Sequence, residues 1–404
     1  MPSSFRAAWV LPISGPPIPN GWVAAADGRI ADVGRGPCAG AVDLGRAAIL
    51  PALVNAHTHL ELSYLAGQVP PAANMVDWVR RQLQLRREAA PADPAAVTDA
   101  ARRAAQAMRE TGTGVVGDVA NSLVTVPVLR ALGLSAVIFH ELLGFSSPDP
   151  AGQVAAARAA IDALGPDAAA SRVRLTLAPH APYSVSPALF GAIRADLDAH
   201  PDGVSTVHLA ESRDESEFVL RGTGRWRALL DDLGAWNPAW QPAGCSPVAY
   251  VARMGLLDRR VLAVHAVQCG TDDVARLREC GTTVVCCPRS NQYVGAGEPP
   301  LAAFYEAGVP VAFGTDSLAS APDLNLFEEL RSARRLAPSV PARRILESAT
   351  SVGAAALGFG RDHGAVAPGL RADLIAVRVP GDVADVEEYL LSGIAPADVT
   401  WLEW

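Results

Sequence analysis

Two histidines separated by one residue, His57 and His59, follow the apolar run 48–54. An apolar run of this length is typical of a buried strand, and side chains two apart on a strand point to the same face. Both imidazoles can therefore reach one point in space, and imidazole is a common ligand of zinc and divalent iron. A His-x-His pattern alone is weak. It gains weight because other candidate ligands also stand at or near the ends of apolar runs, namely His180, His208, His265 and Asp316.

Strand-like runs alternate with helical patterns along most of the chain. Amphipathic patterns such as 95–110 and 151–164 predict helices between the strands. This alternation over residues 48–363 predicts an α/β fold, a (β/α)8 TIM-type barrel, whose chemistry lies at the C-terminal ends of its strands. The expected strands are 48–55, 114–119, 134–140, 173–178, 204–209, 261–265, 282–286 and 310–315.

Both ends of the chain also contain strand-like runs. An Asp-Gly pair at 27–28 lies between two of them, which is a strong hairpin signal. A matching run at 372–377 lies near the other end. We therefore expect residues 1–47 and 364–404 to form one small β-sandwich domain beside the barrel.

The stretch 212–250 is longer than one helix needs. It carries Trp226, Trp236 and Trp240 among several prolines. A long excursion of this kind between barrel strands is typical of a functional insertion, so we expect a lid or capping segment.

Composition excludes several classes of protein. Half of the 404 residues are hydrophobic, 19% are charged and the net charge is -8, which indicates a globular protein without a basic surface for nucleic acid. No apolar stretch approaches the roughly 20 residues of a membrane helix. The six cysteines form no Cys-x-x-Cys pair, so a reducing cytoplasm is the expected location. The chain has no lysine, which excludes a carbamylated lysine bridging two metals.

Four motifs carry a resemblance to a known family. In order and spacing they resemble the amidohydrolase superfamily, in the branch of cytosine, guanine, S-adenosylhomocysteine and aminodeoxyfutalosine deaminases and triazine hydrolases. The resemblance covers nearly the whole chain and implies the barrel with its small β domain. The motifs are Asn-Ala-His-Thr-His-Leu at 55–60, His-Leu-Ala-Glu at 208–211, Val-His-Ala-Val at 264–267 and Gly-Thr-Asp-Ser at 314–317.

The resemblance implies one divalent metal ion as cofactor, zinc first and ferrous iron as the alternative. Such an ion lowers the pKa of a bound water from 15.7 toward about 7. Three neutral imidazoles and one carboxylate leave positive charge at the metal and room for that water. The implied ligands are His57, His59, His208 and Asp316.

Three residues are expected to be catalytic. The resemblance implies that Asp316 also accepts a proton from the attacking water and that His265 orients this water. It implies that Glu211 protonates a ring nitrogen and relays a proton to the departing amine. An aromatic carbon bearing an amino group becomes electrophilic only when the adjacent nitrogen is protonated. The structural alternative for Glu211 is a charge at a helix N-terminus.

Five residues are candidates for contact with the substrate: His180, Trp78, Glu61, Glu141 and Arg289. Trp78 could stack on a ring, and Arg289 could receive a carboxylate in a bidentate manner. The alternatives are structural, with Trp78 in the core, Arg289 in an ion pair, Glu141 at the barrel rim and His180 as a satisfied buried histidine.

Together these features predict a metal-dependent hydrolytic deaminase of an aminated heteroaromatic ring that releases ammonia. Adenine-nucleoside-like substrates are favoured, aminodeoxyfutalosine first. One alternative is a hydrolase that displaces chloride or opens a cyclic amide with the same activated water. Another is a barrel that serves as a scaffold without turnover. The expected partner is a small heterocycle, not nucleic acid or a membrane, and a homodimer is compatible with the family.

Overall fold

The computed structural model describes residues 3–88, 93–165, 172–381 and 383–404. Within them, two four-stranded parallel sheets form a barrel, in the orders β6-β7-β8-β9 and β10-β11-β12-β13. The strands are β6 (Leu53–Thr58), β7 (Thr113–Ala120), β8 (Ser135–Leu142), β9 (Val173–Pro179), β10 (Ser205–Leu209), β11 (Val261–His265), β12 (Thr283–Cys286) and β13 (Val311–Phe313).

Hydrogen bonds at two seams join these sheets into a closed cylinder. The backbone N–H of Asp316, just beyond β13, donates to the carbonyl of His57 in β6 at 3.1 Å. At the other seam the N–H of His208 in β10 donates to the carbonyl of His180, just beyond β9, at 2.9 Å. Closure leaves no unpaired edge in the barrel. The predicted parallel barrel is therefore confirmed.

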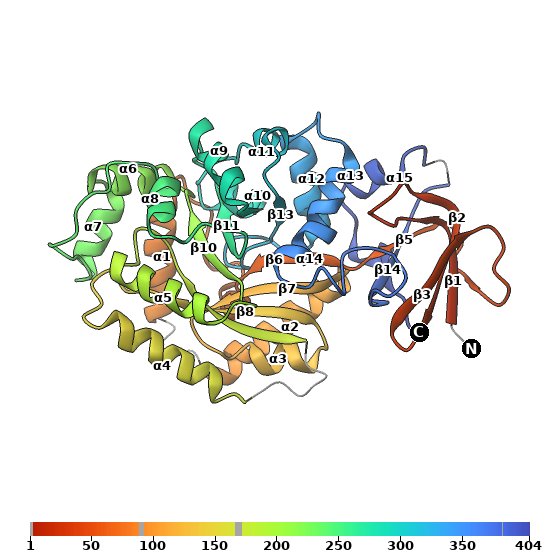
Figure 1. Cartoon of the computed structure of the whole chain (residues 1–404), viewed down its shortest axis with the longest axis horizontal. Coiled ribbons are helices and arrows are strands. Elements are labelled where there is room, and N and C mark those ends of the chain that lie inside the picture. The colour runs from red at the N-terminus through yellow and green to blue at the C-terminus, as the bar shows by residue number, and fades with distance from the viewer. Residues whose placement is uncertain (1–2, 89–92, 166–171, 382) are drawn as a thin grey trace.

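Helices cover the outside of the barrel (Figure 1). α2 is capped by Asp93, which accepts from the N–H of Ala95, and its buried side is a stripe of small residues that packs closely on the barrel. In the described part of the chain no helix is long and apolar enough to cross a membrane. The outer helices are α2 (Pro94–Glu110), α3 (Val126–Ala131), α4 (Pro150–Asp162), α5 (Pro187–Ala199), α9 (Thr271–Cys280), α11 (Leu301–Ala307), α12 (Leu326–Leu336) and α13 (Ala342–Glu347).

The excursion 212–250 contains α6 (Arg213–Arg221), α7 (Arg225–Asp232) and the start of α8 (Pro247–Arg253). α7 lies against α1 (Met75–Glu88), which follows the first barrel strand after a short 3-10 helix. Exposed salt bridges join the two helices, Arg80 to Asp232 at 2.6 Å and Arg225 to Asp77 at 3.2 Å. α1 and α7 therefore form one layer over this end of the molecule.

The two chain ends meet in a seven-stranded sheet, at the right of Figure 1. The Asp27-Gly28 turn has positive φ at both residues (52° and 71°), as a tight hairpin between β2 and β3 requires. The expected β-sandwich is not confirmed, because the described strands of both ends belong to one sheet. They are β1 (Ser3–Val10), β2 (Ile18–Ala26), β3 (Arg29–Arg35), β4 (Val42–Asp43), β5 (Ala47–Pro51), β14 (Leu374–Arg378) and β15 (Val399–Trp401).

The apolar run 48–55, expected as one barrel strand, is two strands. β5 pairs with β1 and β14 in the seven-stranded sheet, whereas β6 pairs with β7 in the barrel. Ala52 lies between them, and its N–H donates to the carbonyl of Asp373 at 2.9 Å. The expected division of the chain at residues 47 and 364 stays a prediction.

Candidate metal centre and active site

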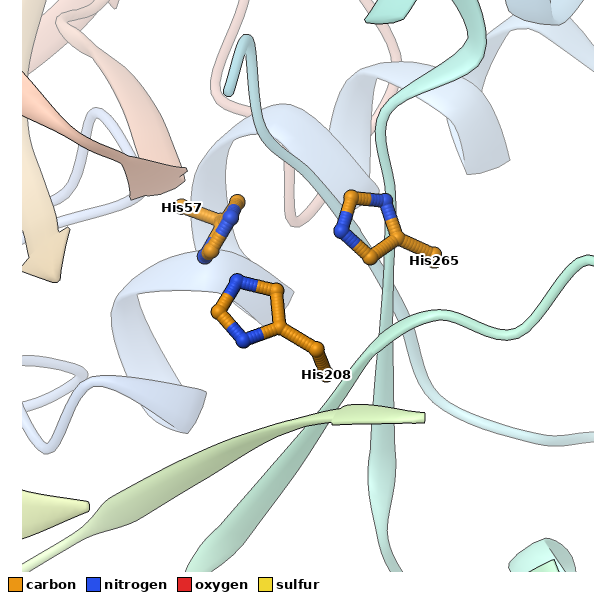
Figure 2. Close-up of side chains that lie close together, drawn as sticks. All are labelled: His57, His208 and His265. Atoms are coloured by element: carbon orange, nitrogen blue, oxygen red, sulfur yellow. The ribbon is translucent and has the colours of Figure 1, made fainter. Parts of the chain in front are cut away.

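Three buried imidazoles converge at the C-terminal end of the barrel. His57 comes from β6, His208 from β10 and His265 from β11, and Figure 2 shows their rings turned toward one another. Their ring centroids are 5.0 Å apart for His57 and His208, and 5.5 Å apart for His208 and His265. One nitrogen from each ring lies within 4.8 Å of the other two.

A second group shares His57 with the first. His57 Nε2 lies 3.8 Å from Asp316 Oδ1, and His59 Nε2 lies 3.7 Å from the same oxygen. His59 Nε2 is also 3.2 Å from His208 Nε2. The structure thus brings the four predicted ligand side chains together, although they come from three distant parts of the sequence.

A hydrogen bond fixes the proton of one of these rings. His208 Nδ1 donates to the carbonyl of His180 at 3.0 Å, which leaves Nε2 without a proton. The lone pair of His208 Nε2 is then free to bind a cation, and His59 Nε2 lies 3.2 Å from it. The arrangement therefore fits a metal ion.

His57 supports the same conclusion. Its side chain is fully buried, and neither ring nitrogen has a hydrogen-bond partner among the described residues. Burial, followed by the neighbouring His59, lowers the pKa of His57 well below its ordinary value. Burial, followed by His180, does the same to the pKa of His208. Neutral imidazoles are the form that binds metals, so the donor set fits a divalent ion.

The motifs around the ligands fix where β13 meets β6. A Cβ on Gly314 would lie 2.7 Å from both the Cβ and the carbonyl oxygen of His57, so only glycine permits this approach. The Asn55 amide donates to Thr315 Oγ1 at 2.7 Å and accepts from the Thr315 N–H at 3.1 Å. These contacts hold Asp316 directly opposite His57.

The chain adopts left-handed backbone conformations where these strands end. Four non-glycine residues have positive φ: Ala210 (51°), His265 (73°), Ala266 (48°) and Asp316 (58°). Each such residue costs about 1–3 kcal/mol, and such residues cluster at functional sites. Two of the candidate residues are thus held in strained conformations that the surrounding barrel must stabilise.

Two side chains of α10 (Pro288–Tyr293) orient catalytic candidates. Ser290 Oγ donates to Asp316 Oδ2 at 2.6 Å. Asn291 Oδ1 accepts from His265 Nδ1 at 2.8 Å. A neutral His265 then presents an unprotonated Nε2 to the site.

Glu211 lies beside His265. Its Oε2 is 3.5 Å from His265 Nε2 and has no hydrogen-bond partner in the described part of the chain. Burial, followed by the charge of Asp316, raises the pKa of Glu211 well above its ordinary value. This shift favours the protonated form, which is the form a general acid needs.

A pocket opens onto this cluster from between α1 and α7. Its wall includes three of the predicted substrate contacts, His180, Trp78 and Glu141. Burial, followed by His59, lowers the pKa of His180 to about 3, so this ring offers a neutral donor or acceptor. The roles assigned to these residues stay predictions.

Comparison with known proteins agrees with this geometry. A model of the amidohydrolase family matches residues 48–394. The chain belongs to the amidohydrolase family. It is 34% identical over 321 residues to an aminodeoxyfutalosine deaminase of Deinococcus radiodurans, covering 77% of this chain and 74% of the relative. It is 31% identical over 412 residues to a 5-methylthioadenosine/S-adenosylhomocysteine deaminase of Moorella thermoacetica, covering 96% and 90%.

A solved structure is similar over nearly the whole length. It is a zinc-bound adenosine deaminase from Xanthomonas campestris, with a TM-score of 0.80 and 28% sequence identity. The match covers 98% of this amidohydrolase and 90% of the neighbour. The parallel barrel and the histidine cluster thus belong to a fold that is seen elsewhere with a divalent metal.

Two predicted substrate contacts do not line the pocket of this amidohydrolase. Arg289 forms salt bridges with Asp323 at 2.9 Å and Glu329 at 3.6 Å, as the structural alternative for this residue expects. Glu61 accepts from the backbone N–H groups of Asn121 (2.8 Å) and Ser122 (3.0 Å), in the loop after β7. Substrate contact by either residue stays a prediction.

Sequence reasoning assigned no role to several residues that orient the site. Ser290 and Asn291 lie in the Cys-Pro-Arg-Ser-Asn segment, but their partners Asp316 and His265 are distant in the sequence. Glu215 was also assigned no role from the sequence. The signal that could have found it is a second acidic residue four positions after Glu211, at the expected start of a helix.

Proposed function

We propose that this amidohydrolase is a hydrolytic deaminase of adenine-nucleoside-like substrates and that it releases ammonia. The observation that carries the proposal is the buried Glu211, whose Oε2 lies 3.5 Å from Nε2 of His265, one of the three converging histidines. A general acid at this position is required to make an amino-bearing ring carbon electrophilic. The deaminase names of the relatives support the same reaction.

His57, His59, His208 and Asp316 would hold one divalent ion, and we propose zinc. A nitrogen-rich set with one carboxylate is typical of catalytic zinc, and the similar adenosine deaminase contains zinc. When bound, the ion supplies Lewis acidity that brings the pKa of a coordinated water toward about 7.

Glu211 donates its proton to the ring nitrogen beside the carbon that carries the amino group. Asp316 accepts a proton from the attacking water, and Ser290 keeps its second oxygen oriented by a hydrogen bond at 2.6 Å. His265 stands between these carboxyl groups, with its ring fixed by Asn291 at 2.8 Å, and orients the water. The water oxygen forms a bond to the ring carbon, and Glu211 relays the proton of the resulting hydroxyl group to the amino group. The C–N bond then breaks as the carbonyl forms, ammonia leaves, and the proton held by Asp316 restores the acid form of Glu211.

The test is a panel of amino-heterocycles with metal-replete protein, monitored for ammonia. We expect ammonia from adenine nucleosides, with aminodeoxyfutalosine and 5-methylthioadenosine as first substrates. Chloride from chlorotriazines without ammonia would instead indicate a chlorohydrolase. Absence of any turnover together with absence of bound metal would favour a scaffold.

Glu211→Gln tests the assigned general acid. The amide has nearly the shape of the carboxyl group but cannot deliver a proton. We expect a loss of kcat of about 100-fold or more, with metal content unchanged. Retained activity in this variant would remove Glu211 from the mechanism.

A further inference from the structure

One face of α1 projects into the pocket. Trp78, Gln82 and Arg86 are spaced four residues apart on this helix, so they share a face, and all three line the pocket together with His59 and Glu141. Arg86 lies in the last turn of α1, and its charge acts on both His59 and Glu141. This face of the helix therefore forms one wall of the pocket beside the metal centre.

Arg86 differs from the other arginines where α1 meets α7. Arg80 and Arg225 form salt bridges across the interface between α1 and α7. Arg86 is only partly exposed, and it has no hydrogen bond or salt bridge with any residue in the described ranges. Its guanidinium carries a positive charge at all accessible pH values. The pocket therefore holds one cation that this part of the protein does not pair.

The acidic residue that interacts with the charge of Arg86 does not form a salt bridge with it. The charge of Arg86 interacts with Glu141, yet no salt bridge joins them. In the described part of the chain, Glu141 Oε2 accepts from Asn121 Nδ2 at 2.8 Å, whereas Oε1 lies 3.3 Å from His208 Nδ1 and has no hydrogen-bond partner. No salt bridge in this part of the chain takes up the Arg86 guanidinium, which keeps its donors for another group.

The opposite wall of the outer pocket is apolar. α7 contributes Leu229 and Leu230, Leu233 follows it, and Leu83 comes from α1. A ligand portion that lies against these side chains is apolar, because they offer no hydrogen bonds. Arg86 supplies a group in this pocket that can bind an anion.

We propose that Arg86 binds a carboxylate on the part of the substrate remote from the adenine ring. Resting on the proposed deaminase function, this assigns the substrate class as adenine nucleosides whose sugar carries an apolar, preferably aromatic, group ending in a carboxylate. The planar guanidinium matches a carboxylate with two parallel hydrogen bonds. Aminodeoxyfutalosine, with its benzoate group, has this chemistry, whereas adenosine and methylthioadenosine do not.

Kinetics of Arg86→Ala test the assignment. We expect kcat/KM for aminodeoxyfutalosine to fall about 10- to 100-fold, mostly through KM, as for the loss of one charge-assisted pair. Values for adenosine and methylthioadenosine should stay within about 2-fold, and Arg86→Lys should restore part of the loss because it keeps the charge. Equal losses on anionic and neutral substrates, or no loss on the anionic one, would overturn the proposal.

Arg81→Ala is the matched control. Arg81 lies on the same helix and has the same charge, but it is exposed and lines neither this pocket nor the neighbouring one that shares Leu229 and Leu233 with it. We expect no selective loss on the anionic substrate. A loss equal to that of Arg86→Ala would mean that general charge, rather than contact, attracts the carboxylate, and would contradict the assignment.

Binding separates this inference from the proposed function. Calorimetry can compare the deaminated product that bears the benzoate group with inosine, in native protein and in Arg86→Ala. We expect tighter binding of the benzoate compound, by about 10-fold or more, only when Arg86 is present. This preference can be found or excluded even if no nucleoside releases ammonia, which would be a failure of the deaminase proposal alone.

Discussion

Glu215 Oε2 accepts a hydrogen bond from the backbone N–H of Glu211 at 2.8 Å. Its Oε1 accepts from the N–H of Ala210, also at 2.8 Å, so one fully buried carboxyl group clamps two successive amides. The clamp begins where Ala210 turns into a left-handed conformation after β10. Glu215 is therefore a positioning residue that fixes the backbone from which Glu211 reaches the site.

Glu215→Gln should weaken this clamp. The amide NH2 would face a backbone N–H, and one buried donor would lose its acceptor, at a cost of about 1–3 kcal/mol in the free energy of unfolding. We expect kcat to fall about 10- to 100-fold while KM and metal content change little. Glu217→Gln, on the same helix but bonded only to Thr223, is the control and should behave like the native protein. An unchanged kcat in Glu215→Gln would contradict the positioning role.

Asn291→Ala should release the His265 ring. Asn291 Oδ1 is the acceptor that selects the Nδ1–H form of His265, so its removal allows the other tautomer and other ring orientations. We expect kcat to fall about 10- to 100-fold, as is typical for groups that orient a catalytic ring. Asn291→Asp keeps an acceptor and should recover part of the rate, with an altered pH profile. Equal rates for the alanine variant and the native protein would show that the bond is dispensable.

Much of the barrel is predictable because most of its strands are apolar runs. The metal and catalytic candidates His57, His208 and His265 are predictable for the same reason, since they lie at or near the ends of such runs. The only further condition is that the strands run parallel to one another. The C-terminal ends of the strands meet at one face, so their terminal side chains converge there.

The boundary between β5 and β6 was not predictable from hydrophobicity. Every residue of both strands is buried, so the sequence has no polar break at Ala52. The two strands differ in their pairing partners, because β5 pairs with β14 whereas β6 pairs with β7. The ion-pair partners of Arg289 were also not predictable from the sequence, because Asp323 and Glu329 follow it by 34 and 40 residues.

Arg289→Ala should damage stability rather than substrate binding. Glu329 is fully buried, and burial raises its pKa to about 8 while Arg289 opposes this shift. Loss of the guanidinium leaves this buried acid without its polar partner, which costs about 1–3 kcal/mol in the free energy of unfolding. We expect KM to stay unchanged in protein that remains folded. Adding Glu329→Gln to the same variant should recover part of the stability, measured by denaturant unfolding. A large rise in KM in the single variant would restore Arg289 as a substrate contact.

Removal of the metal should lower the melting temperature. An ion that binds only the folded chain stabilises it by about 2.7 kcal/mol when present at 100 times its Kd. We expect chelation to abolish ammonia release and Zn²⁺ to restore both activity and melting temperature. His57→Ala should have a melting temperature that no longer responds to Zn²⁺. An identical response in this variant and the native protein would remove His57 from the ligand set.

Asp118 should make stability fall as pH rises. Burial raises the pKa of this β7 side chain to about 7, opposed by the neighbouring Thr125 and by the N–H of Leu60, which donates to Asp118 Oδ1 at 2.9 Å. Because the folded value exceeds the ordinary 3.8, the stabilising contribution is complete below about pH 4 and is lost as pH approaches 7. The slope can reach about 1.4 kcal/mol per pH unit in the free energy of unfolding. Asp118→Asn keeps an oxygen for Leu60 but cannot ionise. Its denaturant unfolding curves between about pH 4 and 7 should therefore lack this slope, and the difference between native protein and variant should stay constant if Asp118 does not titrate in this range.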